Sequence, residues 1–156
     1  MNENFEVIKM NGNLEAMGAN NAEIERVFET VGVNENNARI RYSTTTETND
    51  LFNALSGKSE PVKNYIGETV SVVKLIVTAN DVDADRENPD AGKVNKPIVH
   101  FFTADGKHLS TLSNGIIRNV KFMLECGIIP TVENPINIRF DTVETSNGIA
   151  HIFDIM

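Results

Sequence analysis

Two strand patterns and one helix pattern follow each other directly in residues 97–126, which read PIVHFFTADGKHLSTLSNGIIRNVKFMLEC. The first strand is predicted over residues 97–104 and the second over residues 107–112, because β-favouring residues flank an Asp-Gly turn signal at 105–106. Ser113 is a candidate N-cap for a helix over residues 114–126, whose apolar residues recur at helical spacing. Gly127 and Pro130 end that helix. The pattern therefore predicts a β-hairpin that leads into a helix.

The flanking sequence extends this unit at both ends. Residues 68–82 form a long β pattern that is apolar on both faces, which is typical of a strand that bends and closes a barrel. Two further strands are predicted over residues 135–143 and 149–155, joined through Asn147-Gly148. A strand at 38–48 and a short helix at 50–56 precede the unit. The order of strands and helix predicts a mainly β fold, an OB-type five-stranded barrel with an extra strand, although other small α+β folds use the same elements.

The N-terminal quarter differs from the rest of the chain. Residues 1–37 are rich in Asn and Glu, and we expect them to form an arm on a domain of residues 38–156. A helix is predicted over residues 21–31, with one apolar face made of Ile24, Val27, Phe28 and Val31. Such a short helix is unstable alone, so its face must dock on a neighbouring copy or on its own domain. The first alternative predicts self-association through the arm.

The net charge of −8 is concentrated in two segments. Residues 1–37 contain seven acidic and two basic residues, and residues 81–90 contain five acidic residues and Arg86. The remaining residues hold ten acidic and eleven basic side chains, so a basic surface for nucleic acid stays compatible with the composition. We expect the acidic segment at 81–90 to lie away from any phosphate path.

Targeting and redox signals predict a cytoplasmic location. No apolar run is long enough to span a bilayer, and the acidic start of the chain is unlike a signal peptide. Cys126 is the only cysteine, so the chain makes no intramolecular disulfide.

The sequence lacks the motifs of common catalytic sites, so we expect no enzyme activity and no cofactor. A nucleophile elbow, a phosphate-binding loop and a zinc-protease motif are all absent. The series Asp81, Asp83, Asp85 resembles the start of a calcium loop, but Arg86 and Gly92 occupy positions that need Gly and Glu. We therefore expect no metal site.

Basic and aromatic residues on the predicted strands favour binding of single-stranded nucleic acid, which combines phosphate contacts with stacked bases. Arg41 and Lys107 are expected on solvent faces, and Arg39 on the same face as Arg41. The candidate nucleic-acid-binding residues are Arg39, Arg41, Tyr42, Lys74, Lys96, His100, Phe102, Lys107, His108 and Arg139.

Residues 96–116, KPIVHFFTADGKHLSTLSNGI, resemble OB-fold single-stranded DNA-binding proteins of tailed phages and conjugative plasmids of Gram-positive bacteria. The turn Ser146-Asn147-Gly148 and residues 51–67 are similar as well. The resemblance implies a protein that coats single-stranded DNA, largely independently of sequence, during replication or transfer of a phage or mobile element. Lys107-His108-Leu109 departs from it, because members of this group often place tyrosine there. The alternative is an OB-fold protein-interaction module, with an acidic surface that acts as an adaptor or mimics nucleic acid.

Overall fold

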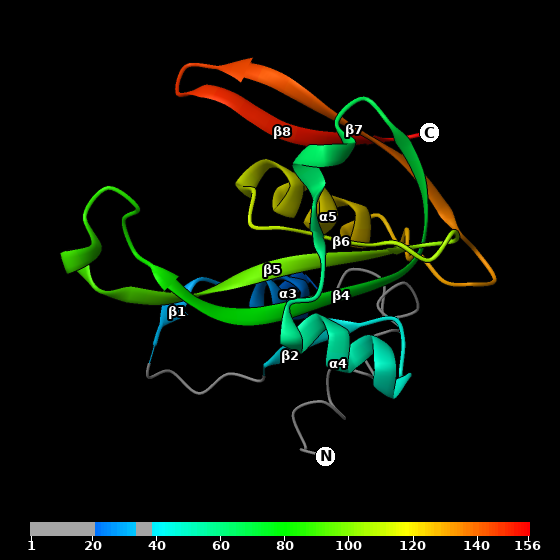
Figure 1. Ribbon diagram of the computed structural model, residues 1–156, viewed down its shortest axis with the longest axis horizontal. Helices are drawn as coiled ribbons and strands as arrows, with labels where there is room; N and C mark the ends of the chain where they lie inside the picture. The colour runs from blue at the N-terminus through cyan, green and yellow to red at the C-terminus, as the bar shows by residue number, and fades with distance from the viewer. Residues whose placement is uncertain (1–20, 34–38) are drawn as a thin grey trace.

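The computed structural model describes residues 21–33 and 39–156 of the chain. These residues form a mainly β structure around one strongly curled, open sheet (Figure 1). Along the sheet the strands follow the order β3 (Glu60–Pro61), β6 (His108–Thr111), β5 (Lys93–Thr103), β4 (Thr69–Asp83), β7 (Ile136–Thr145) and β8 (Gly148–Ile155). Two short strands, β1 (Val31–Gly32) and β2 (Ile40–Ser43), pair with β5 and β4. The prediction of a mainly β fold is confirmed.

The curl of the sheet comes from β4, which pairs with β2 as well as with two long strands, β7 and β5, at successive parts of its length. Residues from Thr69 to Val72 pair with β7, and residues from Val72 to Asp83 pair with β5. The register with β5 shifts between Val72 and Lys74, and such an irregularity bends a strand. The long apolar pattern at 68–82 thus gives one strand that belongs to both halves of the curl, as the sequence predicted.

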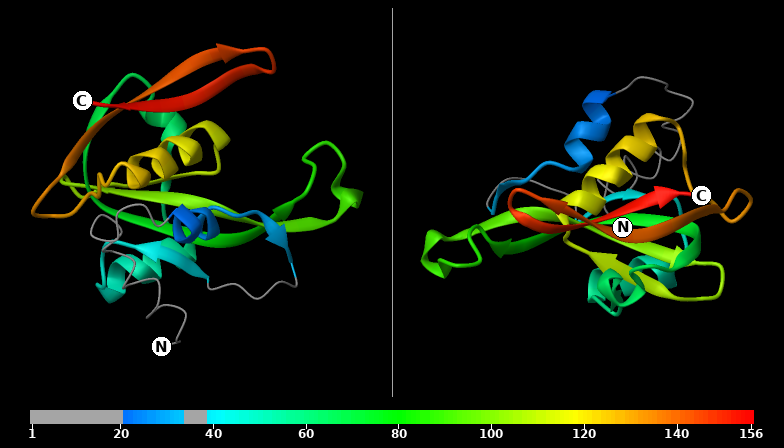
Figure 2. Two further views of the ribbon diagram at one scale, coloured as in Figure 1. Left: turned by 180° about the vertical axis from the view of Figure 1, so that it is seen from behind. Right: turned by 90° about the horizontal axis from the view of Figure 1, so that it is seen from above.

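The helix α5 (Asn114–Glu125) lies in the concave side of this curl (Figures 1 and 2). It buries an apolar face that includes Ile116, Val120 and Leu124. Edge-to-face contacts join Phe101, Phe140 and Phe153, with ring centroids 5.5–6.3 Å apart, so three strands meet in one aromatic core. Helix, hairpin and core all agree with the pattern of residues 97–126.

The outer edge of β8 is held by α5. The amide of Phe153 donates to the side-chain oxygen of Asn119 at 3.0 Å, and the Ser113 hydroxyl donates to the His151 carbonyl at 3.4 Å. Gly115 permits this approach, because a Cβ there would lie 2.2 Å from the His151 carbonyl oxygen. The first turns of α5 therefore pack directly against the backbone of β8.

The N-terminal helix is shorter than predicted and packs on its own domain. It covers Asn21–Val27 (α3), and Ile24 and Val27 are buried in the common core, with Phe28 packed against it. Val31 lies in β1, opposite Asn95, so its predicted place on the helix face is wrong. The apolar face is thus covered by the chain itself. The remainder of the predicted arm lies outside the described residues.

The remaining elements connect the strands. The helix α4 (Thr48–Ser56) follows β2, and the 3₁₀ helix η2 (Val62–Tyr65) follows β3. A second 3₁₀ helix, η3 (Pro89–Ala91), lies in the loop between β4 and β5. Within the described residues, no helix has the length and apolar character needed to cross a membrane.

Candidate nucleic-acid interface

Three of the aromatic rings expected to stack on bases are buried. Tyr42 and His100 are 0% and 2% exposed, and Phe102 is 9% exposed. His108 is half-buried and stacks on Phe102, with ring centroids 4.3 Å apart. The expectation that these rings offer free faces to bases is therefore wrong for Tyr42, His100 and Phe102, and His108 exposes only part of its ring.

His100 is the centre of a buried polar chain. Its Nδ1 lies 2.8 Å from Nε2 of His108, and its Nε2 lies 3.0 Å from the Thr78 hydroxyl, which accepts a bond from Asn80. Burial, with a smaller contribution from His108, lowers the pKa of His100 to about 3. The pKa of His108 is lowered as well, mainly by burial. Both rings are neutral at pH 7, so this pair supplies no positive charge for phosphates.

Lys74 lies on β4, opposite Phe102, and pairs with acidic residues of the segment 47–50. Its ammonium group pairs with Asp50 at 2.8 Å and with Glu47 at 3.3 Å. The hydrogen bond to Asp50 is the main reason that the pKa of Lys74 is raised. The charge predicted for a phosphate is thus used to hold α4 against β4.

Arg41 lies inside the protein, although strand alternation placed it in solvent. It is 5% exposed, and its guanidinium donates to the carbonyls of Val27 and Glu29 and to the Asn95 side chain. Burial lowers its pKa. The prediction failed because carbonyl groups 12–14 residues earlier in the chain satisfy this charge. Arg41 fastens the end of α3 to the sheet.

The other predicted cations lie apart from one another. Arg39 is exposed and does not share the surroundings of Arg41, since the register of β2 shifts between Ile40 and Tyr42. Lys107 pairs with Asp105 at 3.4 Å and lies over the Tyr65 ring, and the bond to Asp105 raises its pKa. Arg139 is exposed on β7, opposite Asp154. The predicted set does not form one continuous strip.

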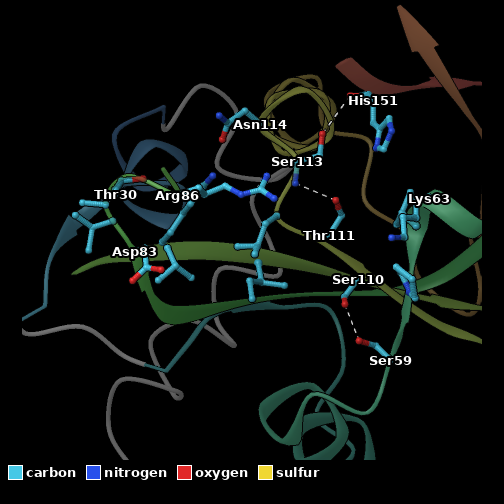
Figure 3. A pocket seen from close by; sticks show the side chains of 18 residues that line it. Thr30, Ser59, Lys63, Asp83, Arg86, Ser110, Thr111, Ser113, Asn114 and His151 are labelled. Atoms are coloured by element: carbon cyan, nitrogen blue, oxygen red, sulfur yellow. Dashed lines mark hydrogen bonds between the residues drawn. The ribbon is translucent and has the colours of Figure 1, made fainter. Parts of the chain in front are cut away.

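A different surface gathers cations around a groove of about 1060 Å³ (Figure 3). Its walls come from the β4–β5 loop, from β5 and β6, from the segment after β3, and from the start of α5 with β8. The groove residues are Thr30, Ser59, Pro61, Val62, Lys63, Val82, Asp83, Ala84, Arg86, Val94, Lys96, Ile98, Ser110, Thr111, Leu112, Ser113, Asn114 and His151.

Three basic side chains and one acidic side chain line this groove. Lys63, Arg86 and Lys96 make no ion pair with any other described residue, whereas Asp83 pairs with Lys93 at 3.0 Å. Burial lowers the pKa of Lys96, and the positive charge of Arg86 lowers it further. Figure 3 shows Arg86 reaching from the β4–β5 loop toward Ser113, with Lys63 at the opposite end. An anion in this groove would relieve the repulsion between Arg86 and Lys96.

Sequence reasoning found Lys96 but missed the other groove cations. Lys63 lies within the segment 61–66, which the sequence indicates as a connector, and Arg86 is the one base in the acidic segment 81–90, which was expected to lie away from phosphates. Asp83, Ala84 and Arg86 of this segment line the groove, so the expectation holds only if phosphates bind elsewhere. Asp81 accepts a hydrogen bond from Asn95. A basic residue isolated among acids was the available signal.

Over residues 21–33 and 39–156, no cluster of three His, Cys, Asp or Glu side chains is arranged to hold a metal ion. Comparisons with family models, curated proteins and solved structures gave no match for this chain.

Proposed function

We propose that this protein is an OB-fold protein that binds single-stranded DNA in the groove and carries out no chemistry itself. The observation that carries the proposal is the set of Lys63, Arg86 and Lys96, three cations that line one groove without an ion pair to any residue of 21–33 or 39–156, in a chain with net charge −8. In a chain with an acidic excess, such a cluster favours a polyanionic ligand.

The strand connections support the OB assignment. The first strand of the unit, β4, pairs with the second, β5, and with the fourth, β7. The fifth strand, β8, pairs with β7, and α5 lies between the third and fourth strands in sequence. In OB folds, the face of the second and third strands and the adjacent loops bind oligonucleotides. Here that region corresponds to β5, β6 and the β4–β5 loop, which border the groove.

The groove lining favours nucleic acid over the alternative of an acidic adaptor. A surface that mimics nucleic acid would present unpaired acids, whereas Asp83 is paired and the three cations have no ion-pair partner within the described part of the chain. The hydroxyl groups of Ser59, Ser110 and Thr111 add hydrogen-bond partners for a sugar-phosphate backbone.

Because each copy offers few cations, we infer that several copies bind side by side on one strand. The process that they would serve is replication or transfer of a phage or mobile element. Three phosphate contacts give modest affinity at physiological salt, so adjacent copies on one strand would have to support each other. Because Ile24 and Val27 are buried in their own domain, we do not assign contacts between copies to that face.

Fluorescence anisotropy with a labelled single-stranded oligonucleotide, over a series of salt concentrations, tests the proposal. The double variant R86Q/K96Q should lose about ten-fold or more in affinity at low salt, and its log K against log salt slope should fall by about 1.4. R139Q removes an exposed charge on β7, outside the groove, and should bind like the wild type.

Two results would contradict the proposal. One is wild-type affinity for R86Q/K96Q with an unchanged melting temperature. The other is an equal loss for R139Q, which would indicate a general charge effect instead of a groove.

A further inference from the structure

The hairpin of β7 and β8 carries an exposed apolar side chain beyond the residue that it contributes to the groove. Ile149 is 72% exposed, which is the largest exposure among the large hydrophobic residues of the described chain. It lies two residues before His151, which lines the groove, and four before Phe153, which lies in the aromatic core. The register of β8 against β7 is continuous from Gly148 to Ile155.

Strand alternation places the side chains of Ile149, His151 and Phe153 on one face of the hairpin. That face begins in the core at Phe153, passes the groove at His151 and continues outward to Ile149. The hairpin and the β4–β5 loop that carries Arg86 project toward the same side of the molecule (Figures 1 and 2). Ile149 therefore lies on the hairpin face that lines the groove at His151, two residues nearer the hairpin turn.

We propose that Ile149 packs against the unpaired bases of the single strand whose phosphates Lys63, Arg86 and Lys96 hold. This inference rests on the proposed function and adds the part of the ligand that the cations do not contact.

The chemistry at Ile149 suits bases and not phosphates. Its cross-strand neighbour on the same face is Glu144, whose charge repels a phosphate but not the neutral face of a base. The groove lining contains no Phe or Tyr, and the aromatic rings expected to stack are covered. An apolar side chain beside the groove supplies the base contact that those rings do not make.

This contact distinguishes single strands from duplex. In a duplex the bases are stacked and paired, so their faces cannot reach Ile149, whereas every unpaired base has an exposed face. The contribution of Ile149 is therefore independent of base identity and of salt, in contrast to the phosphate contacts.

Two oligonucleotides of equal length separate base contacts from phosphate contacts. One carries thymine at every position, and the other carries abasic residues on the same phosphate backbone. We expect I149S to lose about five-fold in affinity for the base-bearing strand and nothing for the abasic strand, with the salt slope unchanged. The matched control is V143S, because Val143 is 42% exposed on the opposite face of the same hairpin.

The outcomes are distinct. Equal binding of both oligonucleotides by the wild type, or equal losses for I149S and V143S, overturns the role of Ile149 and leaves the groove intact. Failure of the wild type to bind either oligonucleotide, with R86Q/K96Q behaving identically, overturns the proposed function and this inference with it. A loss limited to I149S on the base-bearing strand supports the proposal.

Discussion

The two ends of one face of β5 lie in opposite surroundings. Lys96 and Ile98 line the open groove, whereas His100 and Phe102, next on the same face, are buried. The pairing with β4 is in continuous register along this stretch, so the backbone is the same on both sides of the change.

The difference comes from residues 44–59, which cover one end and stop short of the other. Thr44 is hydrogen-bonded to Leu75 of β4, and Asp50 holds Lys74. The covered end stops at Ser59, whose hydroxyl lies 2.6 Å from that of Ser110 at the edge of the groove. Alternation decides which side chains share a face, but a segment distant in sequence decides whether that face is buried or lines an open groove.

The largest expected effect is on stability, and it compares a residue at the covered end of the β5 face with one at the open end. Phe102→Ala should lower the free energy of unfolding by about 3 kcal/mol, because it opens a cavity beside His108. Ile98→Ala should cost about 1 kcal/mol, since its side chain is only partly buried, and should weaken binding of single strands. Urea unfolding and anisotropy at low temperature measure the two quantities.

Folded Phe102→Ala should bind with wild-type affinity. If it does not fold, Phe102→Leu provides the same comparison with a smaller cavity. A larger loss of affinity for single-stranded DNA in the Phe102 variant than in Ile98→Ala would contradict the distinction between a covered and an open end of this face.

A second prediction uses the buried histidine of the covered end. The unfolded state takes up a proton on His100 near pH 6.5, whereas the folded state resists protonation until the pH nears its pKa of about 3. The contribution of His100 to the free energy of unfolding is therefore fully present above pH 6.5. It falls as the pH drops from 6.5 toward 3, by about 1.4 kcal/mol per pH unit. The lowered pKa of His108 acts in the same direction.

Chemical unfolding at pH 7, 6 and 5 should show this loss in the wild type. His100→Gln keeps a polar side chain but removes the titrating ring, so its stability should depend less steeply on pH. An equal dependence in both proteins would exclude His100 as the source.

The central hairpin and the helix α5 were predictable because their signals are local, whereas the short strands β1 and β3 were not predicted. Asp105-Gly106 forms the turn of a β-hairpin, with Gly106 at a φ of 86°. The helix predicted at 114–126 is observed as Asn114–Glu125. These signals depend on neighbours within a few residues, so they can be recognised without knowledge of the tertiary structure.

The groove was not predictable in the same way, because its cations come from separate segments. Arg86 and Lys96 belong to the β4–β5 hairpin, whereas Lys63 follows β3 and reaches the same groove only through the tertiary fold. Arg41 shows the reverse case, since a charge in a strand pattern became an internal link to Val27 and Asn95. Charge and alternation alone could not separate these two outcomes.

The smallest expected effect tests whether the open end of the face continues onto the hairpin. Glu144 lies opposite Ile149, so its carboxylate is close to any strand that reaches Ile149. Glu144→Gln removes this repulsion and should raise affinity for single-stranded DNA about two-fold at low salt. The gain should vanish at high salt, where screening weakens interactions between exposed charges. Asp154→Asn, on the same hairpin but opposite Arg139 and outside the groove, is the matched control and should leave affinity unchanged. An equal gain from both variants would mean that total charge, and not the position of Glu144, sets the effect, and the open surface would then end at His151.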